Sequence, residues 1–140
     1  MDYDRLTRKV RVMIRGEEYS LLLTLGGLAE LEDKMLKEHG GLIEFVQMKD
    51  GKMPPLSVLL AAFKIGLKCA KTKVADADLL AENFCAEYGL DGLIKLFFVM
   101  LASSQILGKE ASKNMLEAFD MESKDKVEIK NGKGVKKAPK

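Results

Sequence analysis

The sequence predicts an α+β domain that is mostly helical: an N-terminal β-hairpin followed by a compact bundle of about five helices. Three observations support this prediction. Residues 9–24 alternate apolar and polar side chains, residues 25–121 repeat apolar side chains at helical spacing, and bulky apolar residues almost disappear thereafter. We therefore expect a hairpin-plus-bundle domain at 1–121 and a lysine-rich, disordered tail at 122–140.

The composition is that of an ordinary single globular domain. Hydrophobic residues make up 47% and charged residues 31% of the 140 residues. No apolar run reaches the roughly 18 residues that a membrane span needs, and "MDYDRLTRK" has no apolar stretch of the kind found in secretory signals. Two cysteines, Cys69 and Cys85, are too few for a disulfide framework, which indicates a reducing, cytoplasmic setting.

The charge is unevenly distributed along the chain. Residues 122–140 contain seven lysines against three acidic residues, a balance of +4, so residues 1–121 carry −2 of the overall +2. A slightly acidic body with a basic tail disfavours a domain that binds nucleic acid through its folded surface.

The segment "KVRVMIRGEEYSLLLTL" predicts the hairpin. Glycine at the first central position of a Gly16-Glu17 loop suits a type II′ turn, which matches the strand twist. This register places all the apolar partners on one face of the sheet. The predicted pairs are Ile14 with Tyr19, Val12 with Leu21, and Val10 with Leu23.

Helical periodicity and capping residues define the remaining elements. We expect helices at about 25–38, 42–49, 55–71, 77–88 and 92–107, with a frayed turn or two at 113–121. Thr24, Asp76 and Asp91 are the predicted N-terminal caps. The helices at 55–71 and 92–107 are apolar on most sides, which predicts that they form the centre of the bundle.

Gly26 and Gly27 stand where the hairpin gives way to the first helix. A dinucleotide-binding loop would need a third glycine and a βαβ unit, and a Walker A loop would need a following lysine, so phosphate binding is disfavoured. We expect the two glycines to let the chain bend tightly out of the sheet and the first helix to pack close to it.

No convergent set of catalytic or metal-binding residues is evident, so we predict no enzymatic activity, cofactor or metal site. The only histidine, His39, has no identifiable nucleophile beside it. Ser103-Ser104 lies inside a predicted helix, where hydroxyls bond back to carbonyls. The two carboxylate clusters are interpreted as solvated or capping groups. They are Glu30/Glu32/Asp33 and Asp76/Asp78/Glu82.

Exposed methionines and a basic hairpin face favour binding to another protein. In the predicted register Met13 and Leu22 are diagonal neighbours on the outer, otherwise basic face of the hairpin, and Met48 and Met53 flank the turn before residue 55. The predicted partner-binding residues are Arg11, Met13, Arg15, Leu22, Met48 and Met53.

The stretch "RGEEYSLLLTLGGLAELEDKM" resembles the N-terminal signature of small tail assembly chaperones from long-tailed bacteriophages and related gene transfer agents. In that family a short hairpin leads into a helix and then a helical bundle. A looser likeness in helix order extends to about Leu107. The residues that carry the motif are Gly16, Tyr19, Leu21, Leu23, Thr24, Gly26, Leu28, Leu31 and Glu32.

The resemblance implies a non-enzymatic role in the cytoplasm of a host bacterium. Such proteins bind the long, helix-rich tape measure protein, keep it soluble until tail tube subunits polymerise around it, and in some cases also contact the tail tube protein. A structural tail component is the alternative within this class, and a homo-oligomer is left open. The alternative from another class is a nucleic-acid-associated domain that uses its lysine-rich tail.

Overall fold

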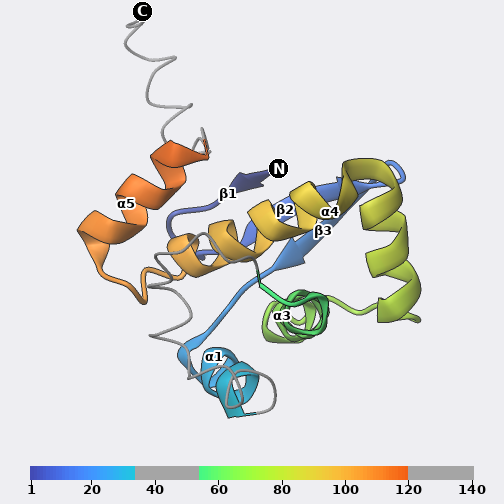
Figure 1. The fold of residues 1–140 in the computed structure, drawn as a ribbon, viewed down its shortest axis with the longest axis horizontal. Coiled ribbons are helices and arrows are strands. Elements are labelled where there is room, and N and C mark those ends of the chain that lie inside the picture. The colour runs from blue at the N-terminus through green and yellow to red at the C-terminus, as the bar shows by residue number, and fades with distance from the viewer. Residues whose placement is uncertain (34–53, 120–140) are drawn as a thin grey trace, which may run out of the picture.

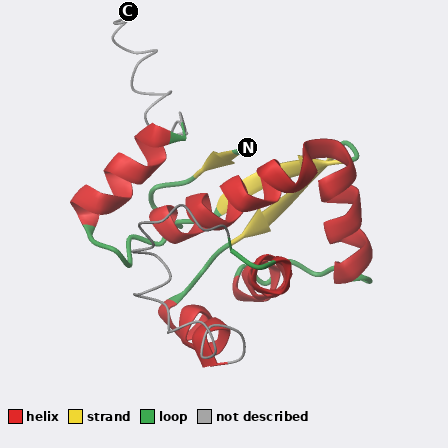
Figure 2. Ribbon diagram, in the orientation of Figure 1, coloured by secondary structure: helices red, strands yellow, loops and turns green. Residues whose placement is uncertain are grey.

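The computed structural model describes residues 1–33 and 54–119 (Figure 1). Within these ranges a three-stranded antiparallel sheet precedes four α-helices (Figure 2). The strands are β1 (Asp2–Tyr3), β2 (Val10–Ile14) and β3 (Glu17–Leu21); the helices are α1 (Leu25–Leu31), α3 (Leu56–Cys69), α4 (Ala77–Ser103) and α5 (Lys109–Ala118). The predicted α+β, mostly helical class is confirmed. The predicted helix at 42–49 and the tail at 122–140 lie outside the described residues.

The hairpin exists, but its predicted register is wrong by two residues. In the structure Ile14 faces Glu17 and Val12 faces Tyr19, so the connecting residues are Arg15 and Gly16. Both have positive φ, 53° and 81°, as the type I′ turn requires, whereas a II′ turn needs a positive φ at its first central residue only. A two-residue shift leaves every side chain on its predicted face, which is why hydrophobic alternation did not distinguish the two registers.

The sheet also has a strand that the prediction omitted. β1 pairs with β2 through Asp2 opposite Arg11 and Tyr3 opposite Val10. Asp4 closes the connection to β2: its Oδ1 accepts hydrogen bonds from the backbone N–H groups of Leu6 and Thr7. Two residues are too short to show an alternating pattern, so periodicity gives no signal for β1.

The bundle differs from the five helices predicted. The helices expected at 77–88 and 92–107 are two helical segments of α4, and Gly89, whose φ of 76° and ψ of 174° are not helical, ends the first segment as predicted. The residue between the two segments is Gly89, so the predicted cap at Asp91 is not found. Residues 113–118 of the expected frayed turn belong to α5, a helix of ten residues that begins at Lys109. The predicted caps Thr24 and Asp76 are confirmed, since their side chains accept hydrogen bonds from Gly27 N and Leu79 N.

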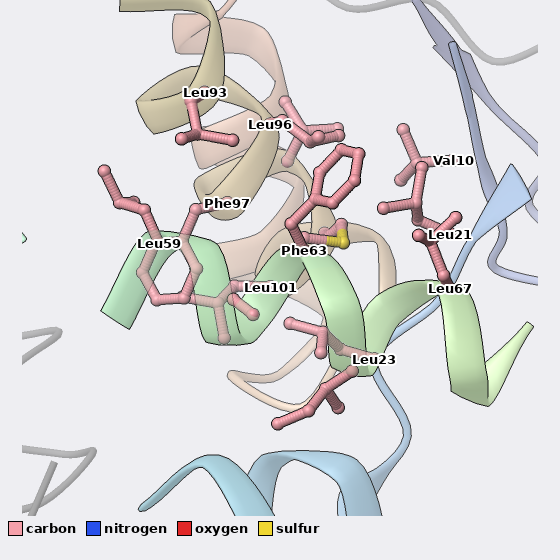
Figure 3. Packing of buried hydrophobic residues seen from close by; sticks show 14 of the residues in the cluster. Val10, Leu21, Leu23, Leu59, Phe63, Leu67, Leu93, Leu96, Phe97 and Leu101 are labelled. Atoms are coloured by element: carbon pink, nitrogen blue, oxygen red, sulfur yellow. The ribbon is translucent and has the colours of Figure 1, made fainter. Parts of the chain in front are cut away.

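The core lies between the inner face of the sheet and helices α3 and α4. Figure 3 shows Val10 and Leu21 of the sheet pointing toward Phe63 of α3 and Leu96 of α4, all of them buried. The two apolar helices thus form the centre of the described bundle, as their composition predicts. None of the helices in the described ranges combines the length and apolar composition of a transmembrane segment.

Gly26 and Gly27 belong to α1, which lies on the far side of α3 from the sheet (Figure 1). A Cβ added at Gly27 would lie 2.6 Å from Cys69 Sγ and 3.1 Å from Ile65 Cγ2, both on α3. The expected close approach of the first helix is therefore made to α3, because α3 itself covers β3. Gly26 is exposed and meets only Thr24 Oγ1, at 3.9 Å.

Candidate protein-binding surfaces

The outer face of the sheet carries two of the predicted partner-binding residues. Met13 is 44% exposed and faces Glu18 on β3. Arg11 is mostly covered, and its Nε lies 2.8 Å from Asp2 Oδ1. The prediction that the face around Met13 is basic is therefore wrong. The observed register places the carboxylate of Glu18 opposite Met13, and Asp2 of β1 supplies a counter-ion for Arg11.

The hairpin turn is held against the corner of α4. The backbone N–H of Arg15 donates to Glu87 Oε1 at 2.9 Å. The Tyr88 hydroxyl donates to the carbonyl oxygen of Met13. Figure 1 shows the turn between β2 and β3 beside the bend of α4. These two bonds join residues more than 70 positions apart in the chain and fix the backbone of Met13 and Arg15 relative to the helix.

Leu22 does not lie next to Met13. It comes after β3, and its backbone N–H donates to Gly66 O of α3 at 3.0 Å. Its side chain is half-buried and lines a cavity of about 440 Å³ near the end of α4, together with Arg8 and Ile106. The predicted diagonal contact between Met13 and Leu22 depended on the incorrect register. Met48 and Met53 lie outside the described residues.

A mostly apolar groove runs along α3 beside α1. It has a volume of about 470 Å³ and is lined by Glu30, Ser57, Leu60, Ala61, Lys64, Ile65 and Lys68. Leu60, Ala61 and Ile65 supply its apolar wall, with Ile65 the most buried of the three. Leu56, one turn before Leu60, is 60% exposed and extends the apolar surface.

Ion pairs define the rim of this groove. Lys68 Nζ lies 2.9 Å from Glu30 Oε1 and joins α3 to α1, while Lys64 Nζ lies 3.0 Å from Asp78 Oδ1 and joins α3 to α4. The hydrogen bond and the charge of Glu30 raise the pKa of Lys68 above its usual value. The groove thus has the apolar wall and charged margins that suit an amphipathic helix.

The residues considered for chemistry have structural contacts. Ser103 Oγ donates to the carbonyl oxygen of Arg8 at 3.2 Å, and Ser104 Oγ donates to Leu101 O at 2.6 Å. Glu30, from the first carboxylate cluster, pairs with Lys68, and Asp76, from the second, caps α4. No group of three metal-ligating side chains converges among residues 1–33 and 54–119. His39 lies outside them.

Both cysteines are half-buried and unbridged. Cys69 Sγ lies 3.4 Å from Thr24 Oγ1, at the contact between α1 and α3. Burial raises the pKa of the Cys85 thiol, which makes its reactive thiolate form less accessible. Both cysteines are therefore partly buried groups packed against the core.

Tyr88 and Glu87 are surface residues that no sequence pattern indicated. Tyr88 falls at the end of an ordinary amphipathic arm, and its bond to Met13 depends on the bend at Gly89. The sequence signal was Tyr88-Gly89 itself, which we interpreted as a helix end only. Comparison with known proteins adds no relative: no protein-family model, curated protein or solved structure matches the chain.

Proposed function

We propose that this protein is a tail assembly chaperone that binds amphipathic helices of a phage tape measure protein and keeps that protein soluble before the tail tube forms. The observation that supports the proposal is the apolar groove beside α1 and α3, bordered by the Lys68–Glu30 and Lys64–Asp78 ion pairs. An amphipathic helix lays its apolar side in such a groove and its polar side against the rim.

The residues of the family-like motif explain the scaffold on which the groove is built. Gly16 forms the hairpin turn and Thr24 caps α1. The leucines at 21, 23, 28 and 31 are all buried. The motif thus specifies a hairpin, a cap and a first helix that packs on α3. Since these leucines face inward, the choice of partner depends on the surface that they support.

Co-expression with a tape measure fragment rich in amphipathic helices tests the proposal. The full chain should raise the soluble fraction of the fragment. Leu60→Lys should reduce that rise several-fold, because it places an ammonium group in the apolar wall. Leu6→Lys is the matched control, since Leu6 is 85% exposed in the β1–β2 connection, outside the groove.

Both variants should keep the far-UV circular dichroism spectrum of the parent chain. Failure of the parent chain to solubilise the fragment would refute the proposed function. Equal solubilisation by Leu60→Lys and Leu6→Lys would refute the assignment of the groove.

The hairpin's outer face, where we predicted partner-binding residues, is a separate surface from the groove. The groove lies between α1 and α3, whereas the carbonyl oxygen of Met13 accepts a hydrogen bond from Tyr88, the residue before the bend of α4. The groove and the hairpin turn therefore serve as independent targets for mutation.

A further inference from the structure

The cavity that Leu22 lines lies where the two strands of the hairpin separate. The ladder between β2 and β3 ends at the pair Val10 and Leu21. Three segments surround the cavity: residues 7–8 before β2, residues 22–25 after β3, and residues 104–106 at the end of α4. They enclose about 440 Å³. We call this space the hairpin-end cavity.

Hydrogen bonds fix the walls of the hairpin-end cavity. Ser103 Oγ donates to the carbonyl oxygen of Arg8 at 3.2 Å and so joins α4 to the segment before β2. Ser104 Oγ donates to Leu101 O at 2.6 Å and accepts from Ile106 N at 3.3 Å. A cavity whose walls are already fixed loses less conformational entropy when a ligand binds.

Two non-glycine residues of this cavity have left-handed backbones. The φ of Arg8 is 64° and that of Gln105 is 62°. The surrounding structure imposes both conformations: Arg8 N donates to Asp4 O at 2.7 Å, and Gln105 N donates to Ala102 O at 3.1 Å. Residues held in such conformations cluster at ligand-binding sites. Here both are exposed and stand at the rim of one cavity.

The cavity offers a positive charge above an apolar floor. Arg8 is the only ionisable side chain that lines it, and no ion pair within the described ranges includes Arg8. Gln105 adds amide donors beside it at the rim. Below them Leu23 is buried, and Leu22 and Ile106 are half-buried. A ligand that fits must therefore combine a negative charge with an apolar body.

We propose that the hairpin-end cavity binds a carboxylate that carries a short apolar body. Arg8 and Gln105 hold the carboxylate, because a guanidinium donates two parallel N–H groups to its two oxygens. The apolar body lies on Leu22, Leu23 and Ile106. The volume falls within the range of about 300–1,000 Å³ that small-molecule sites occupy. A free aliphatic acid and the C-terminal residue of a peptide share this chemistry.

The hairpin-end cavity is separate from the groove between α1 and α3. No residue lines both. The inference therefore does not depend on the proposed function.

Titration of the isotope-labelled full chain, followed by its amide chemical shifts, tests the inference. The probes are octanoate, the tripeptide acetyl-Ala-Leu-Leu with a free carboxylate, and two controls without a carboxylate, octylamine and the amidated tripeptide. We expect saturable shifts at residues 22–25 and 104–106 with a carboxylate probe only, and an affinity that falls as salt rises. Tighter binding of octanoate would identify a free acid as the ligand, and tighter binding of the tripeptide would identify a chain end.

Variants localise the carboxylate. Arg8→Met should weaken binding at least about tenfold, because it removes charge-assisted hydrogen bonds. Arg5→Met is the matched control: it removes an exposed arginine from the same connection, outside the cavity, and should leave affinity unchanged. Gln105→Glu keeps the size of the side chain but places a second negative charge at the rim, so it should also weaken binding several-fold. All three variants should keep the far-UV circular dichroism spectrum of the parent chain.

Three results would overturn the inference. The first is the absence of saturable binding by both carboxylate probes. The second is equal affinity for octanoate and octylamine. The third is equal affinity of Arg8→Met and Arg5→Met for the carboxylate that binds the parent chain.

Discussion

Adjacent glycines at the start of α1 provide a sharp test of how this fold packs. Gly26→Ala should stabilise the protein and Gly27→Ala should destabilise it, although both replace a helical glycine with the best helix former. At the exposed Gly26 the added methyl group lies 3.9 Å from its nearest neighbour, so only the unfolded state is affected. The gain should be about 0.4–1 kcal/mol.

At Gly27 the same gain is outweighed by crowding. The new Cβ would lie 2.6 Å from Cys69 Sγ, 3.1 Å from Ile65 Cγ2 and 3.3 Å from Thr24 Oγ1. Turning the thiol away would break its contact with Thr24, and the branched Ile65 side chain has few rotamers in a helix. Overpacking of this kind costs about 1–3 kcal/mol, so we expect a net destabilisation of about 1–2 kcal/mol.

Urea unfolding followed by circular dichroism measures both effects. For a domain of this size 1 kcal/mol shifts the midpoint by roughly 0.5 M. Cys69→Ala, combined with Gly27→Ala, removes the sulfur that the new methyl group meets, and the double mutant should recover at least about 1 kcal/mol relative to additivity. Equal midpoints for the two single alanine variants, or strict additivity with Cys69→Ala, would refute the packing argument.

Three further predictions concern other contacts. Gly89→Ala should destabilise the protein by about 1–2 kcal/mol in urea unfolding, because an L-residue is strained at φ 76°; an unchanged midpoint would mean that the bend relaxes freely. Thr72→Val should lower the unfolding free energy by about 1 kcal/mol through loss of its hydrogen bond to Ser20 O. Thr7→Val is the control and should cost less, because the exposed Thr7 hydroxyl accepts only a long hydrogen bond, 3.4 Å from Lys9 N. Burial raises the pKa of Tyr88 above 10.0, so the folded state holds this proton more tightly than the unfolded state. The stabilising contribution of the Tyr88 hydroxyl should therefore be complete below about pH 10 and be lost as the pH rises further. In urea midpoints measured from about pH 8 to 11, the decline should be less steep for Tyr88→Phe than for the parent chain. Parallel declines in the parent and Tyr88→Phe would contradict a role for this hydroxyl.

Interactions between residues close in the sequence determined which segments form strands or helices and which of their faces is buried. Alternation placed Val10, Val12 and Ile14 on the buried side of the sheet, and side-chain chemistry identified Thr24 and Asp76 as caps. These features were predictable because neighbours along the chain decide them. The resemblance to tail assembly chaperones came from the same segment, and its partner stays a prediction.

Tertiary structure decided the register, the bend and the surfaces. Both hairpin registers bury the same residues, so only the turn at Arg15-Gly16 and its bond to Glu87 distinguish them. The close approach of α1 to α3 at Gly27 depends on Ile65 and Cys69, 38 and 42 positions later, which no local pattern encodes. Likewise, a two-residue shift places Glu18 opposite Met13, and the tertiary fold sets the Tyr88 hydroxyl against the carbonyl oxygen of Met13. Long-range contacts of this kind produce no periodic pattern in the sequence. They nevertheless determine which side chains lie next to one another at the surface.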